Sequence, residues 1–246
     1  MNLTAEEKLM YEVMKAIYDS GIPIDFKGSM VLKACLLEAG YSEEIRHTVD
    51  IDANWYSKVL PSSEQMIDSL QGALRKSGID LNVTIYRMYG KGRSAGFELA
   101  DSSTGDILFS MDVDVNRPVQ PTKIYEVAGI RFRGITPSQM LADKISAIST
   151  DKVFRRIKDV VDLYYLSHIF DFDKNALLET LENSGRTLES FQGFLHREND
   201  LRHAYEKFRF TGEASKPSFD EVYRTVKTYI RDVLPKETHM DLEYQS

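Results

Sequence analysis

The hydrophobic pattern of the chain changes period near residue 136, and this change limits the possible architectures more than any other feature. Before it, several short runs alternate apolar and polar residues, which predicts β-strands between helices. After it, apolar residues recur every three or four positions, which predicts helices. We therefore expect an α+β protein, with a mixed α/β domain over residues 1–135 and a helical domain over residues 136–246.

The predicted elements follow from caps and periodicity. Helices are expected where a capping residue precedes apolar residues at helical spacing, over 4–21, 30–39 and 62–76. Strands are expected where apolar and polar residues alternate, over 22–27, 49–55, 81–88, 96–100, 107–115 and, as one further strand, 123–132. A second capping box, TPSQ at 136–139, opens the helical part, with helices expected over 137–149, 152–169, 174–183, 187–208 and 218–233.

The composition indicates a folded cytoplasmic protein. The chain has 246 residues, of which 42% are hydrophobic and 28% charged, so it can bury a sizeable core. Cys35 is the single cysteine, so an intramolecular disulfide is excluded and a buried thiol in a reducing compartment is expected. No apolar run approaches the roughly 20 residues that span a bilayer, and we expect no membrane partner. The net charge of −7 argues against extensive coating of nucleic acid, although a local basic patch remains compatible with it.

Two pairs of aspartates lie at strand spacing. Asp50 and Asp52 share one face of a predicted strand, roughly 7 Å apart, and Asp112 and Asp114 repeat the pattern on a later strand. If these strands are neighbours, their carboxylates converge and can hold a hard cation such as Mg²⁺. For one pair alone, a solvated sheet face explains the pattern equally well. The second pair favours a metal site.

Gly28 and Ser29 lie between a predicted strand and a predicted helix. Glycine allows close approach of a ligand to the backbone, and a helix N-terminus offers free N–H groups and partial positive charge to a phosphate. A simple N-cap role for Ser29 is the alternative. The order of strand, Gly-Ser, helix and a strand with Asp-x-Asp favours phosphate binding.

This order of motifs resembles the minimal nucleotidyltransferases of the DNA polymerase β superfamily and, more narrowly, the AbiEii/AbiGii toxin family. The segments KGSMVL at 27–32 and RHTVDID at 46–52 are similar to the family's KGG-T-L and R-S-D-D-D segments. Ser29 and Thr48 are mild departures. Further along, DKISAIS at 143–149 and RRIKDVVDLYYL at 155–166 resemble its helix lysine and its R-x-K-D-hydrophobic-x-D-L helix.

The resemblance implies a polymerase β-type fold with a mixed sheet, followed by a helical domain that contributes to the active site. It implies transfer of a nucleotide from an NTP to an acceptor RNA, such as a tRNA, by the toxin of a toxin–antitoxin pair, with an antitoxin protein as partner. Two Mg²⁺ ions, or Mn²⁺, are expected on the carboxylates Asp50, Asp52 and Asp114 or Asp112. The resemblance also implies Lys144 and Asp159 as catalytic residues, and Gly28, Ser29, Lys144 and Asp162 around the nucleotide. Arg46 is expected to reach the same phosphates because it lies just before the Asp-x-Asp strand.

Simpler interpretations stay open for several of these residues. Lys144 lies within the apolar stripe of its helix and can snorkel at the rim, and Arg46 can pair with Glu43 or Glu44. The basic run Lys152, Arg155, Arg156 and Lys158 is either an RNA-facing patch or a solvated helix face.

Two other functions also remain open: a catalytically silent nucleotide-binding or interaction module, and a metal-dependent phosphohydrolase. The five histidines include no H-x-x-x-H pair, which argues against a zinc site. The sequence also lacks the G-x-S-x-G elbow of a serine hydrolase.

Overall fold

The computed structural model describes residues 3–41, 43, 45–46, 48–90, 94–115, 118–210 and 216–235. Its strands form one mixed sheet in the order β3-β4-β5-β2-β1-β7-β6. The pairs β2–β5 and β1–β7 are parallel, and the other neighbours are antiparallel. The strands are β1 (Ile24–Lys27), β2 (Asp50–Trp55), β3 (Leu81–Tyr89), β4 (Ser94–Asp101), β5 (Ile107–Val115), β6 (Thr122–Val127) and β7 (Ile130–Ile135).

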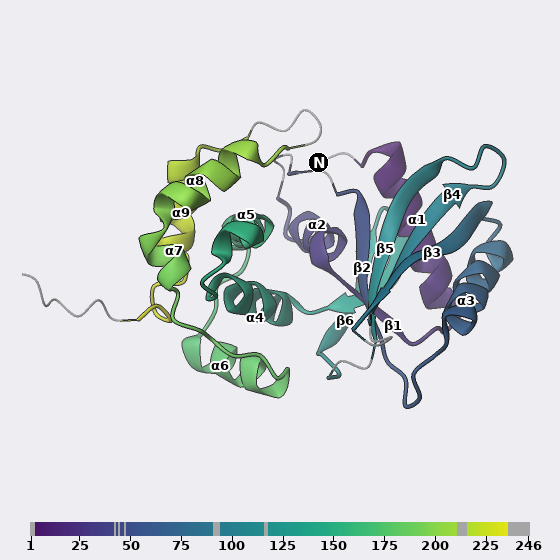
Figure 1. Cartoon of the computed structure of the whole chain (residues 1–246), viewed down its shortest axis with the longest axis horizontal. Helices are drawn as coiled ribbons and strands as arrows, with labels where there is room; N and C mark the ends of the chain where they lie inside the picture. Colours follow the sequence, from purple (N-terminus) through teal and green to yellow (C-terminus); the bar gives the residue numbers. More distant parts are fainter. Residues whose placement is uncertain are drawn as a thin grey trace, which may run out of the picture.

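Three helices accompany the sheet: α1 (Ala5–Asp19), α2 (Gly28–Glu38) and α3 (Ser63–Lys76). A capping box at Thr4 begins α1, as the sequence predicts, and Ser62 forms another at the start of α3. The predicted capping box at 136–139 is only half formed, because Thr136 accepts from the backbone N–H of Gln139 while the Gln139 side chain donates to Asp143 instead. Figure 1 shows α1 and α3 on one side of the sheet and α2 on the other. Helix α2 therefore lies between the sheet and the helices that follow β7.

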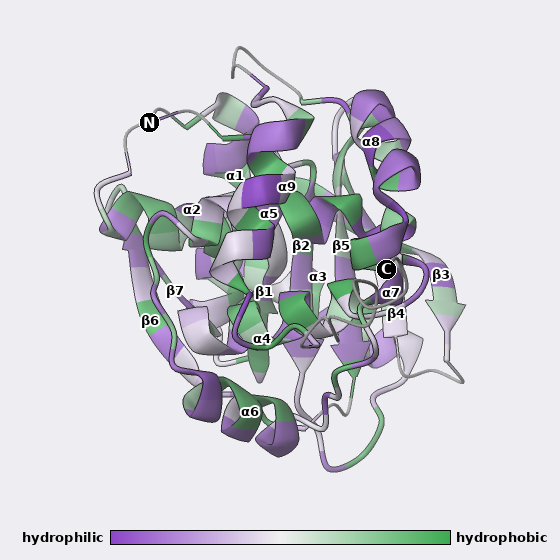
Figure 2. Cartoon of the chain, turned by 90° about the vertical axis from the view of Figure 1, so that its left-hand side faces the viewer, coloured by the Kyte–Doolittle hydropathy of each residue, from purple (hydrophilic) through white to green (hydrophobic). Residues whose placement is uncertain are grey.

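The later helices are α4 (Pro137–Ile148), α5 (Ile157–Leu166), α6 (Lys174–Asn183), α7 (Gln192–His196), α8 (Glu198–Lys207) and α9 (Phe219–Tyr229). They lie beyond α2, to the left in Figure 1, and both α4 and α5 contact α2. Helix α5 is buried along most of its length, whereas α8 is mainly hydrophilic and buries Leu201 and Tyr205 (Figure 2). The inner helices α4 and α5 are thus the ones that reach the sheet side of the molecule.

The alternation of side-chain directions along β2 and β5 determines which face of the sheet carries the polar residues. Ile51 and Ala53 of β2, and Met111 and Val113 of β5, are buried in the core. The aspartates between them therefore lie on the opposite face of the sheet. That face carries the candidate site.

Three predicted elements differ in the structure. The predicted strand 123–132 is wrong, because β6 and β7 form a hairpin whose turn residues Ala128 and Gly129 both have positive φ. The predicted helix 187–208 is two helices, α7 and α8, which are separated at the non-helical Arg197. The predicted helix 152–169 begins as the 3₁₀ turn Val153–Arg156 before α5. The other predicted elements are present, with ends shifted by a few residues. No helix in the described part of the chain is both long and apolar enough to cross a membrane.

Candidate active site

A pocket of about 550 Å³ lies between the polar sheet face, the start of α2 and the inner helices α4 and α5. It brings together residues that are far apart in the sequence. The predicted site residues that line it are Gly28, Ser29, Arg46, Asp50, Asp52, Asp114, Lys144, Asp159 and Asp162.

Gly28 begins α2 in contact with the carboxylate of Asp52. Its φ is +71°, and a β-carbon there would lie 2.2 Å from Oδ2 of Asp52. Both the conformation and the contact therefore require glycine. The N-cap of α2 is Lys27, whose side chain makes no capping hydrogen bond, whereas α1, α3 and α4 have Thr or Ser caps. The interpretation of Ser29 as the N-cap is wrong, since the helix already begins at Gly28.

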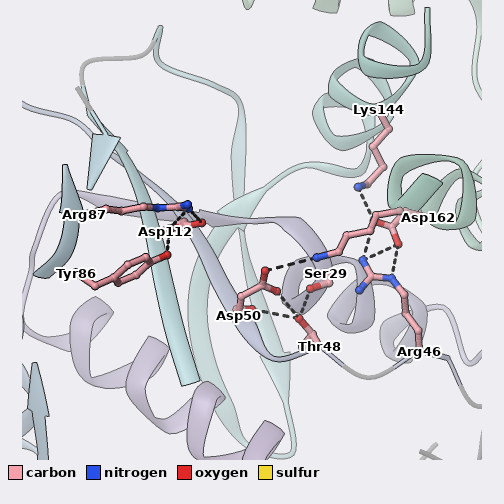
Figure 3. A network of polar contacts seen from close by, with 10 residues as sticks. Ser29, Arg46, Thr48, Asp50, Tyr86, Arg87, Asp112, Lys144 and Asp162 are labelled. Atoms are coloured by element: carbon pink, nitrogen blue, oxygen red, sulfur yellow. Dashed lines mark hydrogen bonds and ion pairs between the residues drawn. The ribbon is translucent and has the colours of Figure 1, made fainter. Parts of the chain in front are cut away.

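A chain of hydroxyl groups connects α2 to β2. The hydroxyl of Ser29 is hydrogen-bonded to that of Thr48, which also donates to Oδ1 of Asp50 at 3.1 Å (Figure 3). Nζ of Lys158 lies 3.8 Å from Oδ2 of Asp50. The Ser29 side chain thus orients Asp50 through Thr48.

Asp52 is the least compensated carboxylate of the pocket. Burial, followed by the neighbouring charge of Asp50, raises its pKa to about 6, although Lys27 and Lys144 act in the opposite direction. No hydrogen bond or ion pair to its carboxylate comes from the residues that the structure describes. A carboxylate in this position is stabilised by any cation that enters the pocket.

Asp112 and Asp114, the second pair of aspartates, lie in two different environments. In the parallel register of β2 and β5, Asp112 is opposite Asp52 and Asp114 is opposite Asn54. Asp114 lines the pocket. Asp112 does not line it, and its carboxylate instead accepts hydrogen bonds from Arg87 at 2.8 and 3.0 Å and from Tyr86 at 3.2 Å (Figure 3).

A buried ionic cluster forms the wall opposite β2. The carboxylate of Asp162, 1% exposed, accepts hydrogen bonds from Nε and Nη2 of Arg46 at 3.1 and 3.2 Å and from Nζ of Lys144 at 2.6 Å (Figure 3). Asp159 lies 3.3 Å from the same Nζ. Burial alone would raise the pKa of Asp162, but Arg46 and Lys144 hold it below its ordinary value. Burial would likewise lower the pKa of Lys144, and Asp162 and Asp159 raise it instead.

The interpretation of Lys144 as a snorkelling residue is wrong, and the structure gives Arg46 a partner other than Glu43. Lys144 does not snorkel at the rim, because it is 7% exposed and its ammonium is directed inward to Asp162. Arg46 also pairs with Asp162, while Glu43 accepts a hydrogen bond from Tyr41. Glu44 lies outside the described residues.

Three charged residues that line the pocket had no role predicted from the sequence: Lys27, Asp143 and Arg186. Lys27 directly precedes Gly28-Ser29, so its place next to the predicted phosphate-binding turn could have identified it as a site residue. Arg186 had no such signal, since its contact with Asp143 at 2.9 Å joins segments 43 residues apart.

The pocket offers some, but not all, of the protein ligands that a divalent metal ion needs. Asp50 and Asp52 present carboxylate oxygens, which Mg²⁺ and Mn²⁺ prefer. Within the described ranges, however, no group of three or more His, Cys, Asp or Glu residues is placed to hold a metal. The β2 pair therefore fits a cation that a substrate also binds.

Comparisons with known proteins identify the family of this chain and support its fold. Residues 17–225 match the family model described as nucleotidyl transferase AbiEii toxin, type IV TA system. The fold is similar to that of MenT4, a nucleotidyltransferase toxin from Mycobacterium tuberculosis H37Rv, with TM-score 0.56 and 13% identity over 93% of this chain and 83% of that chain.

A second solved structure is an antigenic nucleotidyltransferase-like protein from Paracoccidioides brasiliensis, with TM-score 0.48 and 18% identity over 82% of this chain and 92% of that chain. A search of curated proteins gives no match. The first of the two solved structures supports the fold.

Proposed function

This chain belongs to the AbiEii family of nucleotidyl transferase toxins of type IV toxin–antitoxin systems, and we propose that it transfers a nucleotide from a nucleoside triphosphate to an RNA acceptor such as a tRNA. One observation carries the proposal. The carboxylate of Asp52, which has no hydrogen bond or ion pair from the described residues, lies against Gly28 at the start of α2, where no side chain caps the helix. An oxygen ligand for a cation and backbone donors for a phosphate thus lie side by side. A protein antitoxin is the expected partner.

Asp50 and Asp52 would hold a divalent cation, Mg²⁺ or Mn²⁺, together with the triphosphate. Their oxygens suit such a cation, which also relieves the repulsion between the two carboxylates. When bound, the cation stabilises negative charge on the phosphate oxygens and on the acceptor oxygen. Thr48 and Ser29 hold Asp50 in position through their hydrogen-bonded hydroxyls.

The triphosphate would lie between α2 and α4. The free N–H groups of the first turn of α2 donate to its oxygens, and the partial positive charge of the helix start favours them. Lys144 and Arg46 add positive charge on the other side. Asp162 acts as a positioning residue for the Lys144 and Arg46 side chains, because its buried carboxylate is hydrogen-bonded to both of them.

The acceptor hydroxyl would attack the α-phosphorus, forming a new phosphorus–oxygen bond while the bond from the α-phosphorus to the bridging oxygen breaks. Pyrophosphate would leave, and the hydroxyl proton would pass to solvent. Basic residues extend from the pocket to a neighbouring cavity of about 570 Å³, which shares Thr150, Arg155 and Arg156 with it and is also lined by Lys152. These side chains can neutralise the phosphates of an RNA strand.

The test is a transfer assay with purified protein, Mg²⁺, total RNA and each of the four NTPs labelled at the α-phosphate. We expect labelled RNA with at least one NTP, and its loss in Asp52→Asn. Asp68→Asn, at an exposed position on α3, is the matched control and should keep full activity.

Other outcomes identify the alternatives. Triphosphate binding without labelled RNA, in extracts that include the cognate cell's RNA, would indicate a silent binding module. Release of free phosphate without RNA labelling would indicate a phosphohydrolase. Either result would overturn the transfer reaction proposed here.

A further inference from the structure

Lys27 bridges the polar faces of three strands. It is the last residue of β1, and its Cα is the register partner of Asp52 on β2. Its ammonium donates to Oδ1 of Asn54 on β2 at 2.9 Å and to Oδ2 of Asp114 on β5 at 2.7 Å. The Lys27 ammonium thus contacts the carboxylate of Asp114, which the family resemblance implies as a metal ligand.

Both oxygens of Asp114 already have partners. Lys27 donates to Oδ2, and the hydroxyl of Ser94 donates to Oδ1 at 2.6 Å. The side chains of Lys27 and Asp114 are 19% and 23% exposed, so water screens their attraction only in part. A metal ion on Asp114 would have to displace the ammonium and would then face its charge at close range.

The other carboxylate of β5 is engaged in the same way. Arg87 contacts both oxygens of Asp112, which lies outside the pocket lining. Each acidic residue of β5 on this face thus forms an ion pair with a cation of the chain, whereas Asp52 on β2 is attracted by Lys27 and Lys144 without an ion pair among the described residues.

We propose that Lys27 is a resident cation that takes the place of a second divalent metal, so that the site binds a single metal ion per nucleotide, through Asp50 and Asp52. This inference rests on the proposed function and changes the number of metal ions from the two expected above. Lys27 is accordingly a positioning residue, which fixes Asp114 and Asn54 beside the metal-binding pair.

Mn²⁺ and an α,β-methylene nucleoside triphosphate, which cannot be cleaved at the reacting bond, provide the test. Two Mn²⁺ ions in one site show spin–spin coupling in an EPR spectrum, and one ion does not. We expect no coupling in the wild type and none in Asp114→Asn, where bound Mn²⁺ is retained. Lys27→Met removes the ammonium from Oδ2 of Asp114, so we expect coupling to appear, and to vanish again in Lys27→Met/Asp114→Asn.

The contrary results are distinct from one another. Coupled Mn²⁺ in the wild type, lost in Asp114→Asn, would overturn the inference and leave the proposed function standing. No bound Mn²⁺ in the wild type with the analogue would overturn both. An uncoupled spectrum in Lys27→Met would reduce Lys27 to a purely structural residue. If Lys27→Met does not fold, Lys27→Gln, which keeps a hydrogen-bond donor without the charge, takes its place: coupling that appears there supports the inference, and an uncoupled spectrum overturns it.

Discussion

A β-carbon on Gly28 would lie 2.2 Å from Oδ2 of Asp52, so the helix start and the central carboxylate exclude any larger residue between them. Gly28→Ala is therefore expected to destabilise the fold twice, through the positive φ and through the contact. Each strained conformation of this kind costs about 1–2 kcal/mol, and displacement of Asp52 should abolish transfer. Urea unfolding and the transfer assay measure the two effects.

Gly40→Ala is the matched control for that substitution. Gly40 has a φ of +75°, and nothing lies within 4 Å of the place that a β-carbon would take, so alanine there meets the backbone strain alone. We expect it to lose about 1 kcal/mol and to keep activity. Equal losses of stability and activity in the two variants would contradict the importance of the Asp52 contact.

Asp52→Asn is expected to stabilise the metal-free protein while it abolishes transfer. The folded state raises the pKa of Asp52 from 3.8 to about 6, so it binds the proton more tightly than the unfolded state does. The contribution of Asp52 to stability is therefore fullest below pH 4 and declines as the pH rises to about 6. In EDTA, the advantage of Asp52→Asn should grow over that interval to a plateau on the order of 1–3 kcal/mol. Parallel stability curves for the two proteins from pH 4 to 7 would refute this.

The buried ionic cluster of Asp162, Lys144 and Arg46 predicts which substitution costs more stability. Asp162→Asn leaves Lys144 and Arg46 buried without their shared carboxylate, which costs roughly 3–5 kcal/mol. Lys144→Met should cost less, about 1–3 kcal/mol, because Asp162 keeps Arg46. It should also weaken triphosphate binding in a calorimetric titration.

Denaturant titration of both variants and of the double variant gives the coupling between Lys144 and Asp162. The surface pair Lys15–Asp19, whose side chains are about half exposed, supplies the comparison, and Lys15→Met should cost under about 0.5 kcal/mol. A cost for Asp162→Asn as small as that for Lys15→Met would show that the cluster does not stabilise the fold.

Lys152 tests the route of the acceptor. It lines the second cavity and not the first, so Lys152→Glu should weaken RNA binding several-fold and leave NTP affinity unchanged. The dependence of RNA affinity on salt should also become shallower, because one phosphate contact is lost. Arg131→Ala, an exposed change on β7, is the control. Unaltered RNA binding at low salt in Lys152→Glu would exclude this cavity from the route.

Cys35 reports on unfolding. It is 5% exposed, and burial raises the pKa of its thiol to about 11, so the native protein holds almost no thiolate at pH 8. We expect negligible reaction with a disulfide reagent in the native state and one equivalent of reaction in urea. The Cys35 thiol therefore contributes fully to the free energy of unfolding below pH 9, and this contribution is lost as the pH rises to about 11. Rapid labelling of native protein at pH 8 would mean that α2 opens readily.

The sequence by itself determined the features that local geometry controls. Alternation along β2 put Asp50 and Asp52 on one face because successive strand residues point to opposite sides. Caps at Thr4, Ser62 and Thr136 placed helix starts because their side chains bond N–H groups three residues on. The hairpin turn at Ala128-Gly129 was not predicted, although the apolar positions change phase there, from Tyr125 and Val127 to Ile130 and Phe132.

Only the tertiary structure decided which charges meet. Lys27 and Asp114 are 87 residues apart, and Arg46 and Asp162 are 116 apart. Their pairing depends on strand order, register and the packing of α5 against α2, none of which a local pattern encodes. The choice between Asp112 and Asp114 has the same origin: both have the right spacing, and the register of β5 with β2 and β4 brings one to the pocket and leaves the other with Arg87.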